Sequence, residues 1–342
     1  MLRLSVLDQS TIVTGRSPDA SIRESLALAR HCEALGYYRY WLAEHHNSDA
    51  IASTAPEVLI AAIAATTERI RVGSAGVMLP HYSSLKVAEQ FRVLEAIAPG
   101  RLDLGLGRAP GSDGLTAFAL NPNAATAAEH FPAQVRDLLD WLAGRPLADG
   151  HPFGGVRAQP AGPGSPEVWM LGSSDYGAQV AAHFGLPYCF AHFITGGSGA
   201  AEALALYRDG YRPSERHPEP HAALTVWALA AETEAEAERQ FSSRAAWWLG
   251  RQRGIFGPLP SPEEAAARTY TEAERESIAR LRRRAILGTG AQVARMLLNV
   301  AAANAVEEIA LLTTTHDPEV RRRSYTLVGE ALTDAQVALA AE

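Results

Sequence analysis

A carboxylate and two imidazoles stand side by side in WLAEHHNSD, residues 41–49, where the apolar run YRYWLA ends. Imidazole titrates near neutral pH and often carries protons in enzymes, so Glu44, His45 and His46 are candidates for proton transfer. A metal site is one alternative. In another, one imidazole is hydrogen-bonded within the wall of the fold and the other is exposed to solvent, and neither has a catalytic role. Metal sites need three or more converging ligands, and adjacent strand residues point to opposite faces. We therefore expect proton transfer and no metal.

A glycine-rich segment could accommodate a planar or anionic ligand. GLGRAPG, residues 105–111, superficially suggests a dinucleotide fingerprint, but its third glycine comes one position late and Pro110 would obstruct the expected helix. Gly105 and Gly107 instead leave room for a flat ligand near the backbone, and Arg108 offers a guanidinium to a phosphate or a ribityl oxygen. The alternative is a glycine-rich turn with a solvated arginine.

A third segment has the form of a phosphate site. Gly172, Ser173 and Ser174 precede an alanine-rich helical pattern, and the N–H groups at a helix start can bind a dianion together with hydroxyls. Ordinary serine capping of the helix is the alternative. Small residues at 73–76 would similarly let a flat ring lie against a strand, or they mark a bulge.

Strands and helices that alternate regularly must position these residues. Strand-like runs, dense in apolar residues, occur at 2–8, 37–43, 70–79, 101–107, 167–172, 187–193, 224–231 and 307–313. Helical patterns follow them, among them 83–97, 131–143, 174–184, 199–209, 233–249, 291–303 and 317–335. Eight such units favour a (β/α)8 TIM barrel of the α/β class over an open doubly wound sheet. In such a barrel the active site lies at the carboxyl ends of the strands, where the polar groups above are found.

The chain is expected to be one domain, residues 1–342, with three insertions. These are 108–130, 144–166, which is expected to contain a hairpin, and 250–290, which resembles a lid. The first two helices are expected to begin with capping boxes, Ser21-x-x-Glu24 and Thr54-x-x-Glu57.

Composition excludes several classes of partner. The 342 residues are 47% apolar and 20% charged, with a net charge of −7 and no basic tract suited to nucleic acid. Neither a secretory signal nor an 18-residue apolar window is evident, so we expect a cytoplasmic protein that does not enter a membrane. The two cysteines, Cys32 and Cys189, are expected in the core.

Several of these segments together resemble the bacterial luciferase-like flavin-dependent monooxygenases, in the branch with GVMLP and GRAPG motifs. The matching segments are WLAEHH, IRVGSAGVMLPHYSSLKVAEQFRVLE, PGRLDLGLGRAPGSD and VWMLGSSDYGAQVAAHFGLPY. The resemblance is clear over residues 1–230 and looser over 286–335. It implies a TIM barrel that receives reduced FMN (FMNH2) from a separate flavin reductase. The reduced flavin reacts with O2 to a C4a-peroxyflavin, which oxygenates a medium-sized, largely apolar organic substrate. A homodimer is implied as well.

The resemblance also assigns roles to individual residues. His45 matches the essential histidine of the family, with Glu44 and His46 beside it. Ala75 and Gly76 match a non-prolyl cis peptide under the isoalloxazine ring. Arg108 matches the arginine on the phosphate side, and Gly172, Ser173 and Ser174 match the phosphate loop. Gly107 replaces the luciferase cysteine near flavin C4a and Ser173 replaces a glutamate, so light emission is not expected.

Three other functions remain open at this point. An F420-dependent oxidoreductase on the same barrel would transfer hydride without oxygen, and a flavin-binding protein would not catalyse at all. A metal-dependent barrel hydrolase is the third.

The runs Arg282–Arg284 and Arg321–Arg323 are expected on the solvated surface or in salt bridges, although the first could reach an anionic ligand. Trp227, Trp247 and Trp248 are expected in the core, and Trp227 could also line the pocket.

Overall fold

Eight parallel strands close into a barrel in the computed structural model, which describes residues 1–340. Neighbours follow the order β1-β2-β3-β4-β5-β6-β7-β9, and β9 returns to β1, with Arg3 beside Glu308 and Val6 beside Leu311. The predicted (β/α)8 barrel is confirmed. Its strands are β1 (Arg3–Asp8), β2 (Arg39–Leu42), β3 (Arg71–Met78), β4 (Leu102–Gly107), β5 (Glu167–Gly172), β6 (Tyr188–Phe190), β7 (Ala222–Ala231) and β9 (Glu308–Leu312).

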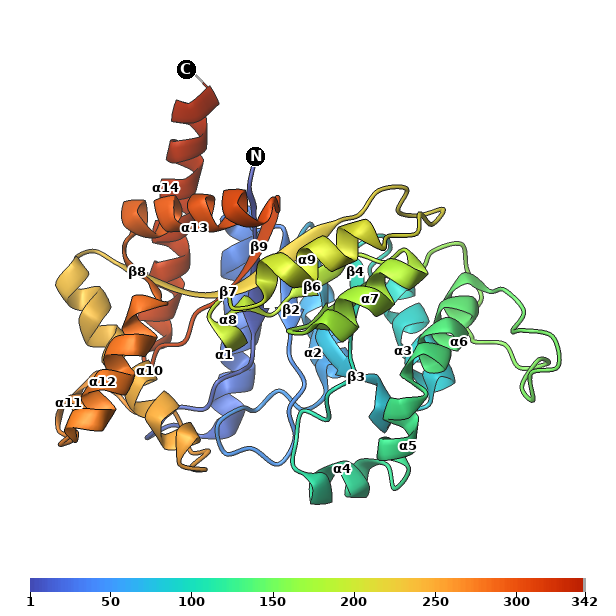
Figure 1. The fold of residues 1–342 in the computed structure, drawn as a ribbon, viewed down its shortest axis with the longest axis horizontal. Coiled ribbons are helices and arrows are strands. Elements are labelled where there is room, and N and C mark those ends of the chain that lie inside the picture. The colour runs from blue at the N-terminus through green and yellow to red at the C-terminus, as the bar shows by residue number, and fades with distance from the viewer. Residues whose placement is uncertain (341–342) are drawn as a thin grey trace.

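Helices surround the barrel (Figure 1). Helix α6 shows why they pack there, because Phe131, Val135, Leu138 and Leu142 recur at helical spacing and are all buried. The helices are α1 (Pro18–Ala34), α2 (Pro56–Ala64), α3 (Ser84–Ile97), α4 (Gly114–Leu120), α5 (Ala124–Glu129), α6 (Phe131–Ala143), α7 (Asp175–Phe184), α8 (His192–Thr195), α9 (Ala200–Asp209), α10 (Glu234–Gln252), α11 (Pro262–Ala266), α12 (Glu272–Arg283), α13 (Gly290–Asn304) and α14 (Pro318–Ala340). Among the described residues, no helix has the length and apolar character needed to cross a membrane.

The two predicted capping boxes are wrong. Helix α1 begins at Pro18, and the Ser21 hydroxyl inside it donates to the carbonyl of Thr11 at 2.9 Å. Helix α2 begins at Pro56, two residues after Thr54. Proline suits the first helical position, because its missing N–H is not needed there and its fixed φ is already helical. Complete capping boxes occur instead at Ser261, Thr271 and Thr289.

The three predicted insertions differ in content. Residues 108–130 contain α4 and α5. Residues 144–166 contain no strand, so the predicted hairpin is wrong. Pro152, Pro160 and Pro163 fall in this segment, and proline cannot donate to a strand ladder. Residues 250–290 contain α11, α12 and a ninth strand, β8 (Ile286–Thr289), which the sequence analysis missed. The division into one domain with three insertions stays a prediction.

Strand β7 carries β8 because it is longer than its neighbours. Residues 224–227 of β7 pair with β9 in the barrel, whereas residues 228–231 pair with β8 beyond it. All ten residues of β7 are buried, so both halves are covered. The segment from α10 to β8 is thereby attached to the barrel at its two ends.

An ion-pair network fills the amino-terminal end of the barrel interior. The buried Arg39 guanidinium bonds Asp103 at 2.8 Å, Glu167 at 2.6 Å and Glu308 at 2.9 Å, and Arg71 also bonds Asp103. The five side chains come from five different strands and compensate one another's charge away from bulk water. Free interior space is left at the carboxyl ends of the strands.

Candidate active site

A cavity of about 860 Å³ lies at the carboxyl ends of the barrel strands. Its volume is near the upper end of the roughly 300–1,000 Å³ that ligand sites span. Every predicted site residue except His46 lines it: Glu44, His45, Ala75, Gly76, Gly107, Arg108, Gly172, Ser173 and Ser174. The fold therefore brings together side chains from strands far apart in the sequence. Their roles in binding or catalysis stay predictions.

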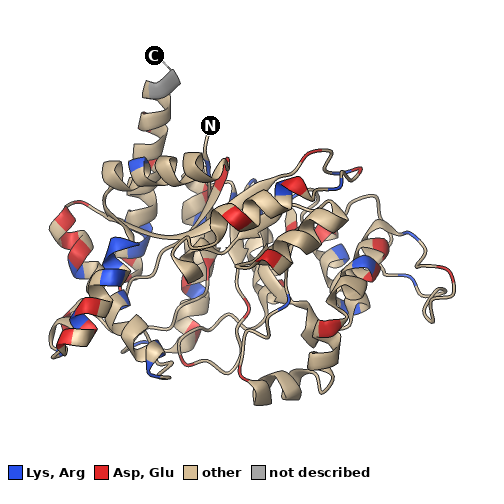
Figure 2. Ribbon diagram, viewed as in Figure 1, with Lys and Arg blue, Asp and Glu red and all other residues tan. Residues whose placement is uncertain are grey.

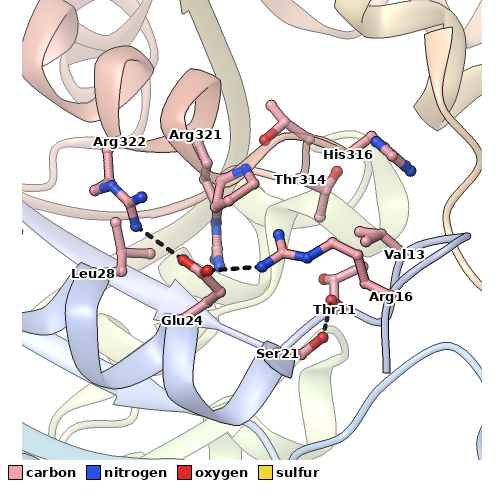
Figure 3. A pocket seen from close by; sticks show the side chains of 12 residues that line it. Thr11, Val13, Arg16, Ser21, Glu24, Leu28, Thr314, His316, Arg321 and Arg322 are labelled. Atoms are coloured by element: carbon pink, nitrogen blue, oxygen red, sulfur yellow. Dashed lines mark hydrogen bonds and ion pairs between the residues drawn. The ribbon is translucent and has the colours of Figure 1, made fainter. Parts of the chain in front are cut away.

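A second hollow, between α1 and the loop after β9, is much smaller (Figure 3). Its volume of about 30 Å³ is far below the roughly 300 Å³ at which ligand sites begin. Figure 3 shows Arg16 and Arg322 bonded to Glu24, at 2.8 and 2.9 Å. These charges compensate one another, so the large cavity is the candidate site. Within residues 1–340, no three His, Cys, Asp or Glu side chains converge in a way that could hold a metal ion.

The His45 imidazole lines the cavity from the loop after β2. Its Nδ1 lies 3.3 Å from the carbonyl oxygen of Gly111, which can only accept, so Nδ1 carries the hydrogen of the neutral ring. Nε2 has no hydrogen-bond partner among the described residues. Burial lowers the pKa of His45, and the charge of Arg251 adds to this, against the opposing effects of Gly111 and Glu44. At neutral pH, Nε2 is thus a free base on a side chain that lines the cavity.

Glu44 is buried and held by three donors. Met78 donates its backbone N–H to Oε2 at 3.1 Å, and Tyr82 donates its hydroxyl to Oε1 at 2.8 Å. The Nε2 of His46 also lies 2.8 Å from Oε1. Burial and the Glu44 carboxylate raise the pKa of Tyr82, so its hydroxyl stays a donor at neutral pH. Glu44 and His46 therefore brace the loop that presents His45. Tyr82 was missed because nothing in the sequence marks a contact 38 residues away.

Donors for an anion gather where β4 and β5 end. Ser174 is the N-cap residue of α7, yet its side chain makes no capping bond, so the alternative of an ordinary serine cap is wrong. Among the described residues, the Ser173 and Ser174 hydroxyls and the Arg108 guanidinium have no hydrogen-bond or ion-pair partner. The Arg108 guanidinium lies 3.9 Å from the centre of the Tyr176 ring, and both side chains line the cavity. Two hydroxyls, the N–H groups at the start of α7 and one guanidinium are thus available to a dianion.

Small residues of β3 and β4 form another part of the wall. The Ala75–Gly76 peptide is cis, as the resemblance implies. Gly107 lies against Met78, whose methyl carbon would be 2.6 Å from a Cβ at that position. Gly105 lies outside the wall, because a Cβ there would collide with the backbone carbonyl of Ser74 on β3. The close approach of two strands requires that glycine, and the expected ligand contact at Gly105 is wrong.

One face of α10 lines the cavity and was not recognised from the sequence. It carries Arg244, Trp247, Trp248 and Arg251. The expected core position is wrong for Trp247 and Trp248, which are only partly buried, whereas Trp227 is buried and lines the cavity, as expected. The Arg244 guanidinium stacks on Trp227 of β7, 3.8 Å from the ring centre. Residues 244, 248 and 251 follow the i, i+4, i+7 spacing of one helix face, which is the signal that could have revealed them.

The two arginine runs divide between surface and interior. Arg282 pairs with Glu238 at 2.6 Å, as expected, whereas Arg284 lines the cavity. Arg321 is buried rather than on the surface, but its ion pair with Asp8 at 2.8 Å agrees with the expected alternative of a salt bridge. Both cysteines are buried, as predicted.

A family model described as luciferase-like monooxygenase matches residues 2–310. The chain belongs to this family. A luciferase-like monooxygenase of Escherichia coli (strain K12) is 39% identical, over 95% of this chain and 96% of that one. An N-acetyl-S-alkylcysteine monooxygenase of Bacillus subtilis (strain 168) is 35% identical, over 98% of this chain and all of that one.

Solved structures agree with the family. Apo-MsnO8 is 36% identical, with a TM-score of 0.89 over 97% of this chain and 99% of that one. More distant chains share the fold alone. They include the oxygenating constituent of 3,6-diketocamphane monooxygenase from Pseudomonas putida in complex with FMN (18% identity, TM-score 0.71, over 97% of this chain and 98% of that one). An F420-dependent secondary alcohol dehydrogenase is another (14% identity, TM-score 0.61, over 97% of this chain and 99% of that one). The luciferase-like fold thus occurs with more than one cofactor.

Proposed function

We propose that this luciferase-like monooxygenase uses reduced FMN and O2 to oxygenate a medium-sized organic molecule. One observation carries the proposal: a single cavity combines unpaired donors for a phosphate, a wall of small residues and a neutral imidazole. We also propose that a separate flavin reductase supplies the FMNH2 and that the enzyme is a cytoplasmic homodimer. Reduced flavin, when bound, supplies the electrons with which O2 is activated.

The residues of the cavity fit FMN at both of its ends. Ser173, Ser174 and Arg108 would hold the phosphate, because all three offer donors that no described residue uses. The Ala75–Gly76 segment would lie against the flat ring, since neither residue carries a bulky side chain. The donor set suits a dianion, and the wall suits a planar aromatic system.

His45 would hold or move a proton at Nε2. The Gly111 carbonyl fixes its tautomer, and burial keeps the ring neutral at neutral pH. Such a group can take a proton from a substrate or return one to an oxygen, which typically contributes a factor of about 10² to 10⁴ in rate. Residues 244–284 cover part of the cavity and would limit the access of water to the reacting atoms.

The test follows the oxidation of FMNH2 by O2. FMNH2 is mixed with the enzyme under argon and then with buffer containing O2, and flavin absorbance is recorded with and without protein. We expect oxidation at a rate that differs from that of free FMNH2 and that changes in the presence of substrate. Oxidation that matches the buffer control would favour a non-catalytic flavin-binding protein.

An F420-dependent oxidoreductase is the second candidate, since an F420-dependent enzyme shares this fold. It would transfer hydride anaerobically with F420, whereas the proposed enzyme requires O2. The monooxygenase names of two relatives above 30% identity support oxygenation. Anaerobic turnover with F420 and none with FMNH2 would reverse this choice.

A further inference from the structure

The cavity contains far more positive than negative charge. Five arginines line it: Arg108, Arg244, Arg251, Arg280 and Arg284. The single carboxylate in the lining, Glu44, is already occupied by its own donors. A phosphate at the β5–α7 junction would compensate Arg108, and Arg280 lies 3.9 Å from Glu276. Among the described residues, Arg244, Arg251 and Arg284 would then remain without an anion.

Arginines elsewhere on the same segment do have anionic partners. Figure 2 shows acidic and basic residues interspersed along α10, α11 and α12. Arg239 bonds Glu236 at 2.8 Å and Glu263 at 2.6 Å on the exposed side of α10. Within residues 1–340, Arg244 and Arg251 make no ion pair or hydrogen bond through their side chains. The unpaired cations therefore lie on the cavity side of the helix.

Aromatic rings hold both guanidiniums in place. Arg244 lies 3.8 Å from the centre of the Trp227 ring, and the Trp227 indole N–H donates to the Thr314 hydroxyl at 3.0 Å. Arg251 lies 4.9 Å from the centre of the Trp247 ring. A stacked guanidinium keeps the N–H groups at its edge free for hydrogen bonds in its own plane, and this geometry suits a carboxylate.

The environment of Arg244 argues for a ligand rather than for packing alone. Burial lowers the pKa of Arg244 to about 9, and no nearby carboxylate counters the effect. The side chain is still protonated at neutral pH. A cation in a partly desolvated cavity is stabilised once an anion enters and bonds it.

We propose that Arg244 and Arg251 bind an acidic group of the organic substrate, of the carboxylate type, whose remaining part lies among the aromatic residues of the cavity. The inference rests on the proposed function and specifies its substrate class. It adds an anionic end to the medium-sized, largely apolar molecule expected from the sequence. Arg251 also lies close enough to His45 to influence its pKa, so an anion at Arg251 would place the substrate near that imidazole.

The test compares acids with their amides. Hexanoate and 3-phenylpropionate, with hexanamide and 3-phenylpropanamide, are titrated calorimetrically into the purified full chain with and without FMN. We expect both acids to bind at least about tenfold more tightly than their amides. Arg244→Gln should weaken acid binding by about 10- to 150-fold, the range for a lost charged hydrogen bond, and change amide binding less than about twofold.

Two control variants separate the proposal from its rivals. Arg239→Gln removes an exposed, paired arginine of the same helix and should leave all four dissociation constants unchanged. Arg244→Lys keeps the charge and should restore part of the acid preference. Acids that bind no more tightly than amides, or a preference that survives Arg244→Gln, would overturn the proposal.

Flavin binding is measured in the same preparations. If Arg244→Gln weakens FMN but not riboflavin, Arg244 serves the cofactor phosphate and the proposal is wrong. If the acid preference depends on Arg244 but FMNH2 is oxidised only at the buffer rate, the anion site stands and the proposed oxygenation fails.

Discussion

Arg108→Ala is expected to weaken FMN binding because it removes the guanidinium proposed to hold the phosphate. The side chain has no anionic partner among residues 1–340 and stacks only on Tyr176, so its removal leaves no protein carboxylate unpaired. The loss is therefore that of one charged hydrogen bond, about 1.5 to 3 kcal/mol. That free energy corresponds to a dissociation constant about 10- to 150-fold higher.

Riboflavin provides the internal control, because it has the same ring and ribityl chain but no phosphate. Dissociation constants for FMN and riboflavin are measured by flavin fluorescence for the wild type and the variant. We expect Arg108→Ala to reduce the preference for FMN while riboflavin binds as before. Arg136→Ala, an exposed arginine of α6 paired with Asp137 at 3.2 Å, serves as the matched variant and should change neither value.

Two results would refute this reasoning. An unchanged FMN dissociation constant would mean that Ser173, Ser174 and the start of α7 suffice for the phosphate. An equal loss for riboflavin would mean that Arg108 acts on the ring or on the shape of the cavity. Circular dichroism melting of the variant guards against a general loss of structure.

Three further predictions concern catalysis and stability. His45→Ala should lower turnover by about 10²-fold or more in steady-state assays with the FMN dissociation constant kept, and unchanged turnover would exclude His45 as the proton carrier. Asp103→Ala should lower the free energy of unfolding, measured by urea denaturation, by about 3 to 5 kcal/mol, because it leaves Arg39 incompletely paired in the interior. A decrease below about 1 kcal/mol would show that water or the other carboxylates compensate the charge of Arg39. For Glu167, burial alone would raise the pKa, but Arg39, Arg71 and the indole N–H of Trp169 together outweigh it and lower the pKa to about 2 from an ordinary 4.5. Because the pKa is lowered in the folded protein, the ionised Glu167 contributes about 3 kcal/mol to the free energy of unfolding above pH 4.5, and this contribution is lost as the pH falls towards 2. In Glu167→Gln, the free energy of unfolding should therefore change less with pH between 4.5 and 2.

Much of the barrel could be predicted because its signals are local. The strand at 101–107 is a short apolar run, and the helix at 131–143 has apolar residues at helical spacing that end at a glycine; both appear within one residue of the expected bounds. Strand β8 could not be predicted in the same way. Its four residues form a strand only because the outer half of β7 offers an unpaired edge.

The candidate site was predictable where chemistry is concentrated in short motifs. His45, Arg108 and Ser174 stand at strand ends, and the barrel topology alone brings such positions together. Arg244 was missed because its importance depends on the distance to Trp227, a contact made by packing of α10 on β7. Gly105 was misread for a similar reason, since only the structure shows that its hydrogen faces a neighbouring strand.

The pairing of the first strand with the last has a consequence during protein synthesis. Glu308, on the last strand β9, accepts hydrogen bonds from Ser5 of β1 and Arg39 of β2. These two strands are therefore synthesised some 270 to 300 residues before the carboxylate that they bind. Until the ribosome has released β9, the nascent sheet has two open edges and Arg39 lacks one of its counterions. Contacts between such distant segments are slow to form, so the barrel can close only after β9 has been synthesised, and its closure is a late event in folding.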